Sequence, residues 1–191
     1  MGNDIIKFFN YDDSYYKEQL QKSELKKNQA MLLKKSKELA YAIKKSCEIK
    51  MYFVTKDVNE NNLRMILNFG HTFAHAIEVK NNYTKKITHG EAVLTGMILA
   101  AKISFLKKIC NRKTFEEIKN IYDNNNLSYT YKNYLNFNAI NSLIPYLKND
   151  KKNNDDKINF ILLEKIGKTS LPNKNKISLS GLKLLSKSIS Q

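Results

Sequence analysis

Proline and glycine are scarce in this chain. Its 191 residues include two prolines and six glycines, so few positions interrupt helices or allow sharp turns. No stretch has the Gly-x-Gly-x-x-Gly pattern of a dinucleotide-binding loop, and the alternation of strands and helices that surrounds such a loop is also missing. The sequence therefore predicts a mainly α fold, and it excludes a dinucleotide-binding fold built by this chain alone.

Cysteine and long apolar runs are also rare. The two cysteines, Cys47 and Cys110, have no partner at metal-ligand spacing, so we expect two buried thiols and no disulfide. No apolar run approaches the roughly 20 residues that span a bilayer. The first residues include acidic side chains where a secretory signal has basic ones. We expect a single globular domain over residues 1–191, cytoplasmic and without membrane contact.

Acidic residues are few compared with basic ones. Lysine and arginine number 33 against 18 aspartates and glutamates, which gives a formal net charge of +15. Such an excess favours anionic partners when it is clustered. Here the lysines are spread along the whole chain and interleaved with asparagine and isoleucine. We therefore expect no nucleic-acid partner, although an anionic substrate would benefit from the charge.

Helical periodicity dominates the chain and leaves little room for strands. It predicts helices over 23–52, 63–79, 88–108, 114–122, 139–147 and 178–188. Thr88 and Glu91 have the spacing of a capping box, so we expect Glu91 to close that box. The apolar run 158–163 is the one predicted strand. The sequence therefore predicts a mostly helical domain with a minor β element.

Histidine occurs three times, always between residues 71 and 89. A rotation of about 100° per residue places five polar side chains on one face of the helix over 63–79: Arg64, Asn68, His71, His75 and Glu78. Most of the other side chains of this helix are apolar, which predicts burial. A buried polar face must be paired, bind a metal or line a cavity, and the alternative is a solvated stripe. The spacing of His71 and His75 alone suits a pair of metal ligands.

The residues around these histidines form two motifs. From Arg64 the chain reads Arg-x-x-Leu-Asn-Phe-Gly-His-Thr-Phe-x-His-Ala-Ile-Glu, and from His89 it reads His-Gly-Glu-Ala-Val. Both closely resemble the signature of the 3-dehydroquinate synthases, in the sugar-phosphate cyclase family. Residues 2–7 and 150–152 also resemble family segments, so the resemblance covers about residues 2 to 170. It implies the multi-helical C-terminal domain of the dehydroquinate synthase-like fold, with the N-terminal nucleotide-binding domain absent.

The resemblance implies a lyase of the shikimate pathway, which leads to chorismate and the aromatic amino acids. The family converts 3-deoxy-D-arabino-heptulosonate 7-phosphate to 3-dehydroquinate and phosphate with NAD and a divalent metal, zinc or another such as cobalt. By position, the metal ligands would be Asp4, His71 and His89, with Asp4 standing where the family has glutamate. Ala74 replaces a glycine of the family pattern.

The resemblance also implies roles for polar residues around the substrate. Five would be catalytic and contact the substrate: Lys7, Lys50, Arg64, Asn68 and His75. Lys152 would bind the substrate as well, as a point charge, whereas Arg64 offers a planar fork for bidentate pairing. The role of Glu78 stays open between support of a metal ligand and a solvated position.

The implied partners are the anionic sugar phosphate, the missing nucleotide-binding domain and a second copy of the chain in a homodimer. Because no segment here forms a phosphate cradle, the isolated chain is expected to be inactive and to bind no NAD. Two alternatives remain at this point. One is a cyclase that acts on another sugar phosphate, and the other is a degenerate, non-catalytic binding domain.

Overall fold

The computed structural model describes residues 29–83, 87–127, 131–148 and 157–189. The chain forms two compact units, Met1–Thr55 and Lys56–Gln191. The expected single domain over 1–191 stays a prediction.

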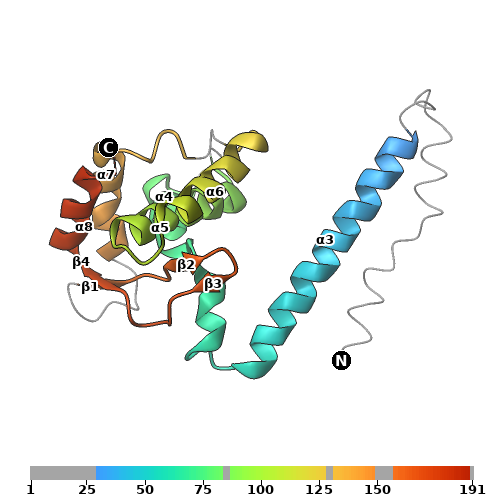
Figure 1. Ribbon diagram of the computed structural model, residues 1–191, viewed down its shortest axis with the longest axis horizontal. Coiled ribbons are helices and arrows are strands. Elements are labelled where there is room, and N and C mark those ends of the chain that lie inside the picture. Colours follow the sequence, from blue (N-terminus) through green and yellow to red (C-terminus); the bar gives the residue numbers. More distant parts are fainter. Residues whose placement is uncertain (1–28, 84–86, 128–130, 149–156, 190–191) are drawn as a thin grey trace. The chain divides into compact units, whose positions relative to one another are not determined.

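The described part of the first unit lies in one long helix, α3 (Gln29–Lys56; Figure 1), of which only the last residue belongs to the second unit. It confirms the predicted helix over 23–52 where the two overlap, and it continues to Lys56. Apolar residues of this helix are exposed, among them Leu39 and Ile43. Cys47 is only half-buried, so the expectation of a buried thiol is wrong at this position and right for Cys110. The spacing of apolar residues predicts this helix, but it does not predict that these apolar side chains are exposed in the structure.

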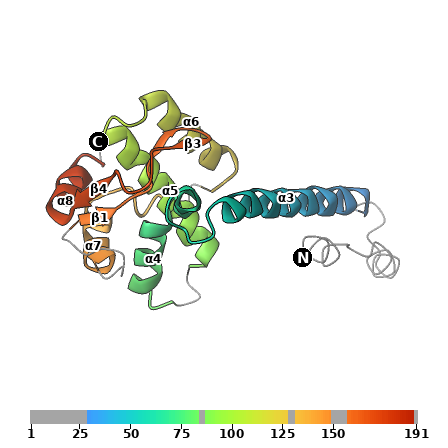
Figure 2. The same cartoon turned by 90° about the horizontal axis from the view of Figure 1, so that it is seen from below.

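The second unit is a helical layer with short antiparallel strands (Figures 1 and 2). Helix α5 packs against α4, α6 and β2, while α7 packs against α4 and α8. Strand β1 pairs with β4, and β2 pairs with β3. The bounds of these elements are α4 His71–Lys80, α5 His89–Leu106, α6 Arg112–Asn124, α7 Phe137–Lys148, α8 Leu179–Lys187, β1 Lys157–Asn159, β2 Leu163–Lys165, β3 Lys168–Thr169 and β4 Lys176–Ser178. The predicted mainly α fold with a minor β element is confirmed, and helices α5 to α8 end within a few residues of their predicted positions.

Helix α5 lies in the core of the second unit. Ile98, Leu99 and Ile103 on this helix are fully buried. Among the described residues, α5 is long and apolar enough by composition to cross a membrane, but half of its window is buried inside the unit. A buried hydroxyl also fixes α5 to the sheet region, because Ser104 Oγ accepts a hydrogen bond of 2.9 Å from the backbone N–H of Leu163. The apolar composition of α5 is therefore explained by its place in the core.

The strand predicted over 158–163 is two strands in the structure. β1 ends at Asn159 and β2 begins at Leu163, and the residues between them are buried outside any ladder. The backbone changes its partner here. Phe160 N–H donates to the carbonyl of Asn175, whereas the carbonyl of Leu162 accepts from Ser170 N–H. A continuous apolar run does not reveal such a change of partner.

The helix predicted over 63–79 is also divided. Residues Leu63–Asn68 form a 3-10 helix, η1, and α4 begins only at His71. Between them Gly70 has φ +86°, a left-handed conformation that favours glycine. The five polar side chains of the prediction therefore do not share one helix face. Within α4 the predicted phase is confirmed, because Phe73 and Ile77 are fully buried while His75 is exposed.

The break at Gly70 lies against α5. A Cβ atom on Gly96 would lie 2.0 Å from the carbonyl oxygen of Gly70, and a Cβ atom on Gly70 would lie 2.6 Å from the backbone nitrogen of Met97. Real Cβ atoms do not approach backbone so closely, so both positions require glycine in this packing. The helices α4 and α5 consequently meet backbone to backbone at the point where α4 begins.

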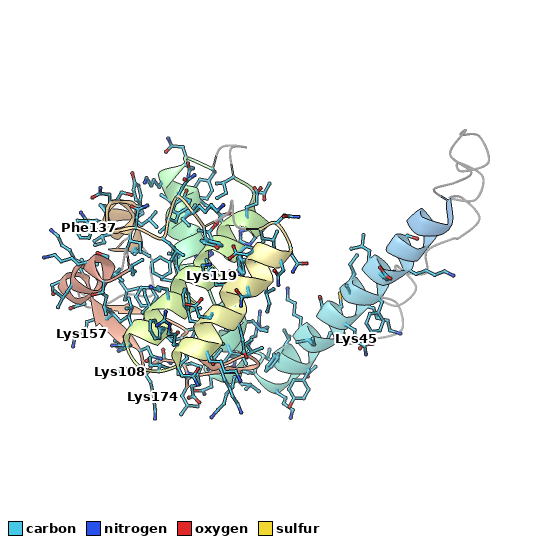
Figure 3. All side chains as sticks on the ribbon, turned by 45° about the horizontal axis from the view of Figure 1, so that its top comes forward. Lys45, Lys108, Lys119, Phe137, Lys157 and Lys174 are labelled. Carbon is cyan, nitrogen blue, oxygen red and sulfur yellow. The ribbon has the colours of Figure 1, made fainter. Side chains whose placement is uncertain are left out.

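The positive charge of the second unit is distributed over several elements. Lys108 follows α5, Lys157 lies in β1 and Lys174 lies between β3 and β4, and all three side chains are exposed (Figure 3). This spread agrees with the even distribution of lysine along the sequence.

Candidate metal centre

Two of the three histidines occupy the first position of a helix. His71 opens α4 directly after Gly70, and His89 opens α5 directly after its N-cap, Thr88. The capping box predicted for α5 is confirmed: Glu91 N–H donates to Thr88 Oγ1, and Thr88 N–H donates to Glu91 Oε2 at 2.8 Å. Glu91 therefore fixes the start of the helix that carries His89.

The three imidazole rings gather around His71. The ring centres of His71 and His89 are 5.8 Å apart, and those of His71 and His75 are also 5.8 Å apart. All three belong to the second unit, where α4 and α5 pack together. Ring distances alone thus leave both His75 and His89 as candidate co-ligands of His71.

His71 has a buried nitrogen. Its Nδ1 atom has no hydrogen-bond partner among the residues that the structure describes. Burial lowers the pKa of His71; the neighbouring His75 and His89 act in the same direction, while the carbonyl of Phe69 and the carboxylate of Glu78 oppose them. A neutral imidazole offers a lone pair, which is the state that metal binding requires.

Glu78 contacts His89. Its Oε1 atom lies 2.9 Å from His89 Nδ1. The Glu78 side chain is 16% exposed and the His89 side chain is 61% exposed. The sequence left the role of Glu78 open. In the structure Glu78 is a largely buried side chain that contacts an exposed histidine.

Arg64 and Asn68 belong to a second group of side chains that is centred on Glu60. Asn68 Nδ2 donates to Glu60 Oε1 at 2.6 Å, and Arg64 Nε lies 3.7 Å from Glu60 Oε2. Arg64 Nη1 also donates to the carbonyl of Val58 at 2.9 Å. Glu60 was missed by the sequence analysis. Its place four residues before Arg64 is the spacing of a local ion pair, which is the signal that would have found it.

Asp57 holds the segment that carries this second group. Its carboxylate accepts hydrogen bonds from the backbone N–H groups of Arg64, Asn62 and Asn61, and these bonds keep the pKa of Asp57 below its ordinary value. Asp57 thus fixes the start of η1 and positions Arg64.

The other expected site residues lie elsewhere. Lys50 is exposed on α3, in the first unit. The remaining three lie outside the described residues: Asp4, Lys7 and Lys152. In the part of the chain that the structure describes, no group of three His, Cys, Asp or Glu side chains is arranged to hold a metal. Of the three expected metal ligands, the described residues therefore include the two histidines, His71 and His89. The third, the carboxylate of Asp4, is not among them.

Comparison with known proteins gives one consistent family. Residues 3–153 match the family described as 3-dehydroquinate synthase C-terminal. The 3-dehydroquinate synthase of Pelagibacter ubique (strain HTCC1062) is 44% identical over 133 residues, which are 70% of this chain and 36% of that protein. The 3-dehydroquinate synthase of Endomicrobium trichonymphae is 43% identical over 133 residues, 69% of this chain and 35% of that protein. The chain thus spans little more than a third of the length of these relatives.

A solved structure agrees with the sequence relatives. A 2-deoxy-scyllo-inosose synthase, complexed with carbaglucose-6-phosphate, NAD+ and Co2+, superimposes with a TM-score of 0.58 and 26% identity. The superposition covers 73% of this chain and 38% of that chain. The family match spans most of the sequence, includes both histidine motifs and agrees with the helical fold, so this chain belongs to the 3-dehydroquinate synthase C-terminal family.

Proposed function

We propose that this chain is the metal- and substrate-binding part of a 3-dehydroquinate synthase, acting on 3-deoxy-D-arabino-heptulosonate 7-phosphate in the shikimate pathway. The observation that carries the proposal is the pair His71 and His89, at the starts of two packed helices with ring centres 5.8 Å apart. The relatives are about three times as long as the matched segment, so NAD is assigned to the part of the enzyme outside this match. Homodimerisation and a cytoplasmic location stay predictions.

The proposed metal ligands are Asp4, His71 and His89, a carboxylate and two imidazoles that suit zinc or cobalt. A metal bound about 2 Å from an imidazole nitrogen lies roughly 3 Å from the ring centre, so rings 5.8 Å apart are compatible with one shared ion. Burial also lowers the pKa of His71, which favours the neutral imidazole that a metal ion requires. When bound, a divalent metal would supply Lewis-acid polarisation of substrate hydroxyl groups.

The proposed substrate contacts come from charged and polar side chains outside the metal ligands. Arg64 keeps guanidinium N–H groups beyond its contacts with Val58 and Glu60, and their planar arrangement suits a phosphate or carboxylate. Asn68, linked to the same Glu60, is assigned to a substrate hydroxyl. His75 is exposed beside His71, which suits a group that passes protons between substrate and solvent. Lys7, Lys50 and Lys152 would add positive charge.

A second candidate is a cyclase for another sugar phosphate. The likeness to a 2-deoxy-scyllo-inosose synthase favours it, whereas the curated relatives at 43% and 44% identity favour 3-dehydroquinate synthesis. The metal site would be the same in both, so the substrate has to be tested directly.

The proposed function is tested by combining this chain with the nucleotide-binding half of a relative. The nucleotide-binding half of the Pelagibacter ubique enzyme is mixed with this chain, NAD and zinc, and phosphate release is measured with the heptulosonate phosphate and with glucose 6-phosphate. We expect release from the heptulosonate phosphate only when both halves are present, because hydride transfer requires NAD held against the substrate.

Three results would count against the proposal. Phosphate release by this chain alone, or a tight one-to-one titration of this chain with NAD, would contradict the assignment of NAD to the other half. Release from glucose 6-phosphate alone would favour the second candidate.

Asp4 gives a separate prediction about the metal. Because aspartate is one methylene shorter than the family's glutamate, Asp4→Glu is expected to tighten metal binding by about tenfold, and Asp4→Asn to weaken it by about as much. Competition with a chelating dye measures both affinities. If Asp4→Asn binds as tightly as the native chain, Asp4 is not a ligand.

A further inference from the structure

We propose that Glu78 is a positioning residue for His89: it fixes the proton of that imidazole on Nδ1 and leaves the Nε2 lone pair for the metal. This inference rests on the proposed function, because it assigns His89 to a metal ion. It concerns a contact between two helices, since Glu78 lies in the last turn of α4 and His89 opens α5.

The contact fixes the tautomer because of the chemistry of its acceptor. Glu78 Oε1 lies 2.9 Å from His89 Nδ1, which is hydrogen-bond distance. An ionised carboxylate only accepts hydrogen bonds, so Nδ1 must carry the hydrogen. A neutral imidazole with its hydrogen on Nδ1 has its lone pair on Nε2. The nitrogen that remains available is therefore the one on the far side of the ring from Glu78.

The surrounding structure fixes the position of Glu78 and the backbone of His89. Glu78 follows Ile77, which is fully buried in the core, and its own side chain is only 16% exposed. The backbone at His89 is held by the capping box of Thr88 and Glu91. The His89 ring itself is 61% exposed, so little other than Glu78 restrains its rotation. Removal of Glu78 should therefore free the ring to rotate without unfolding the helix.

His71 has a different arrangement. Its Nδ1 atom is buried, and among the described residues no carboxylate makes a hydrogen bond to this ring. The hydrogen bond of Glu78 is thus directed to one of the two proposed imidazole ligands. Carboxylates that orient a metal-bound histidine in this way commonly account for about tenfold to a hundredfold in metal affinity.

The test compares the native chain with Glu78→Ala, Glu78→Gln and the control Glu117→Ala, which removes an exposed carboxylate from α6. Long-range proton–nitrogen NMR of the metal-free chains reports the tautomer of His89. We expect hydrogen on Nδ1 in the native chain and the control, and a shift toward hydrogen on Nε2, the form favoured by free imidazole side chains in water, in Glu78→Ala. Glu78→Gln keeps an acceptor oxygen and should lie between them.

Metal affinity is then measured for the same four chains with Co2+ by visible absorption. Glu78→Ala should bind about tenfold to a hundredfold more weakly than the native chain, with Glu78→Gln between them and the control unchanged. An unchanged tautomer in Glu78→Ala would overturn the inference, as would a changed tautomer with unchanged affinity. If the native chain binds no Co2+ while its tautomer responds to Glu78, the proposed metal function fails and the positioning role fails with it. Because glutamine has nearly the same shape as glutamate, Glu78→Gln keeps the test valid if Glu78→Ala does not fold.

Discussion

Gly96→Ala is expected to lower the free energy of unfolding of the second unit by about 3 kcal/mol, the upper end of the usual range for overpacking. The new Cβ atom would lie 2.0 Å from the carbonyl oxygen of Gly70 and 3.1 Å from the backbone nitrogen of Ala74. These are backbone atoms, so no side-chain rotation relieves the overlap. Urea denaturation followed by circular dichroism measures the loss.

Gly90→Ala is the matched control for this prediction. Gly90 lies on the same helix, but apart from its chain neighbours and its own helix backbone no atom of the described residues lies within 4 Å of the Cβ position there. Alanine is the better helix former, so this change should leave the stability unchanged or raise it by up to about 1 kcal/mol. Equal stabilities of the two variants would show that α4 and α5 are not in backbone contact at Gly70 and Gly96.

The second large effect is expected at the metal. We expect the native chain to bind one divalent ion, and the His71→Ala, His89→Ala double variant to bind none, because two of three ligands are lost. Each single variant should bind at least about a hundredfold more weakly, since even residues that only orient a ligand contribute tenfold to a hundredfold. Elemental analysis after dialysis gives the stoichiometry, and chelator competition gives the affinities.

His75→Gln separates the two possible histidine pairs. The ring of His75 is as far from His71 as that of His89 is, so distance alone does not choose between them. If His75 passes protons and is not a ligand, His75→Gln should retain the metal and lose activity in the reconstituted enzyme. Loss of the metal in His75→Gln, with its retention in the single variant His89→Ala, would favour the pair His71 and His75 over the one proposed here. Retention of the metal in the double variant would exclude both pairs.

The sequence predicts helices well where the signal is local. α5 begins where Thr88 and Glu91 form a capping box, and apolar periodicity marks the buried side of α4. The break at Gly70 is not predictable in this way, since its cause is contact with Gly96 on another helix. The division of the apolar run 158–163 likewise follows from hydrogen bonds to residues more distant in the sequence.

The candidate site shows the same limit. The rarity of histidine, together with the family motifs, identifies the three imidazoles that the structure brings together. The contact of Glu78 with His89 was not predictable from the positions of polar residues along α4, because His89 lies on α5. Arg64 and Asn68 were expected on the same helix face as His71. The left-handed residue Gly70 interrupts the helix before His71, and Arg64 and Asn68 both contact Glu60 instead.

The placement of His71 and His89 in the first turns of two helices has a dynamic consequence. Helix ends open more readily than helix centres, in local fluctuations that leave the rest of a domain closed. Opening of either turn would withdraw one imidazole while the core around Phe73 stays intact. The lifetime of the metal-binding arrangement is then set by these two turns and not by global unfolding, and an ion that joined them would slow amide exchange at both.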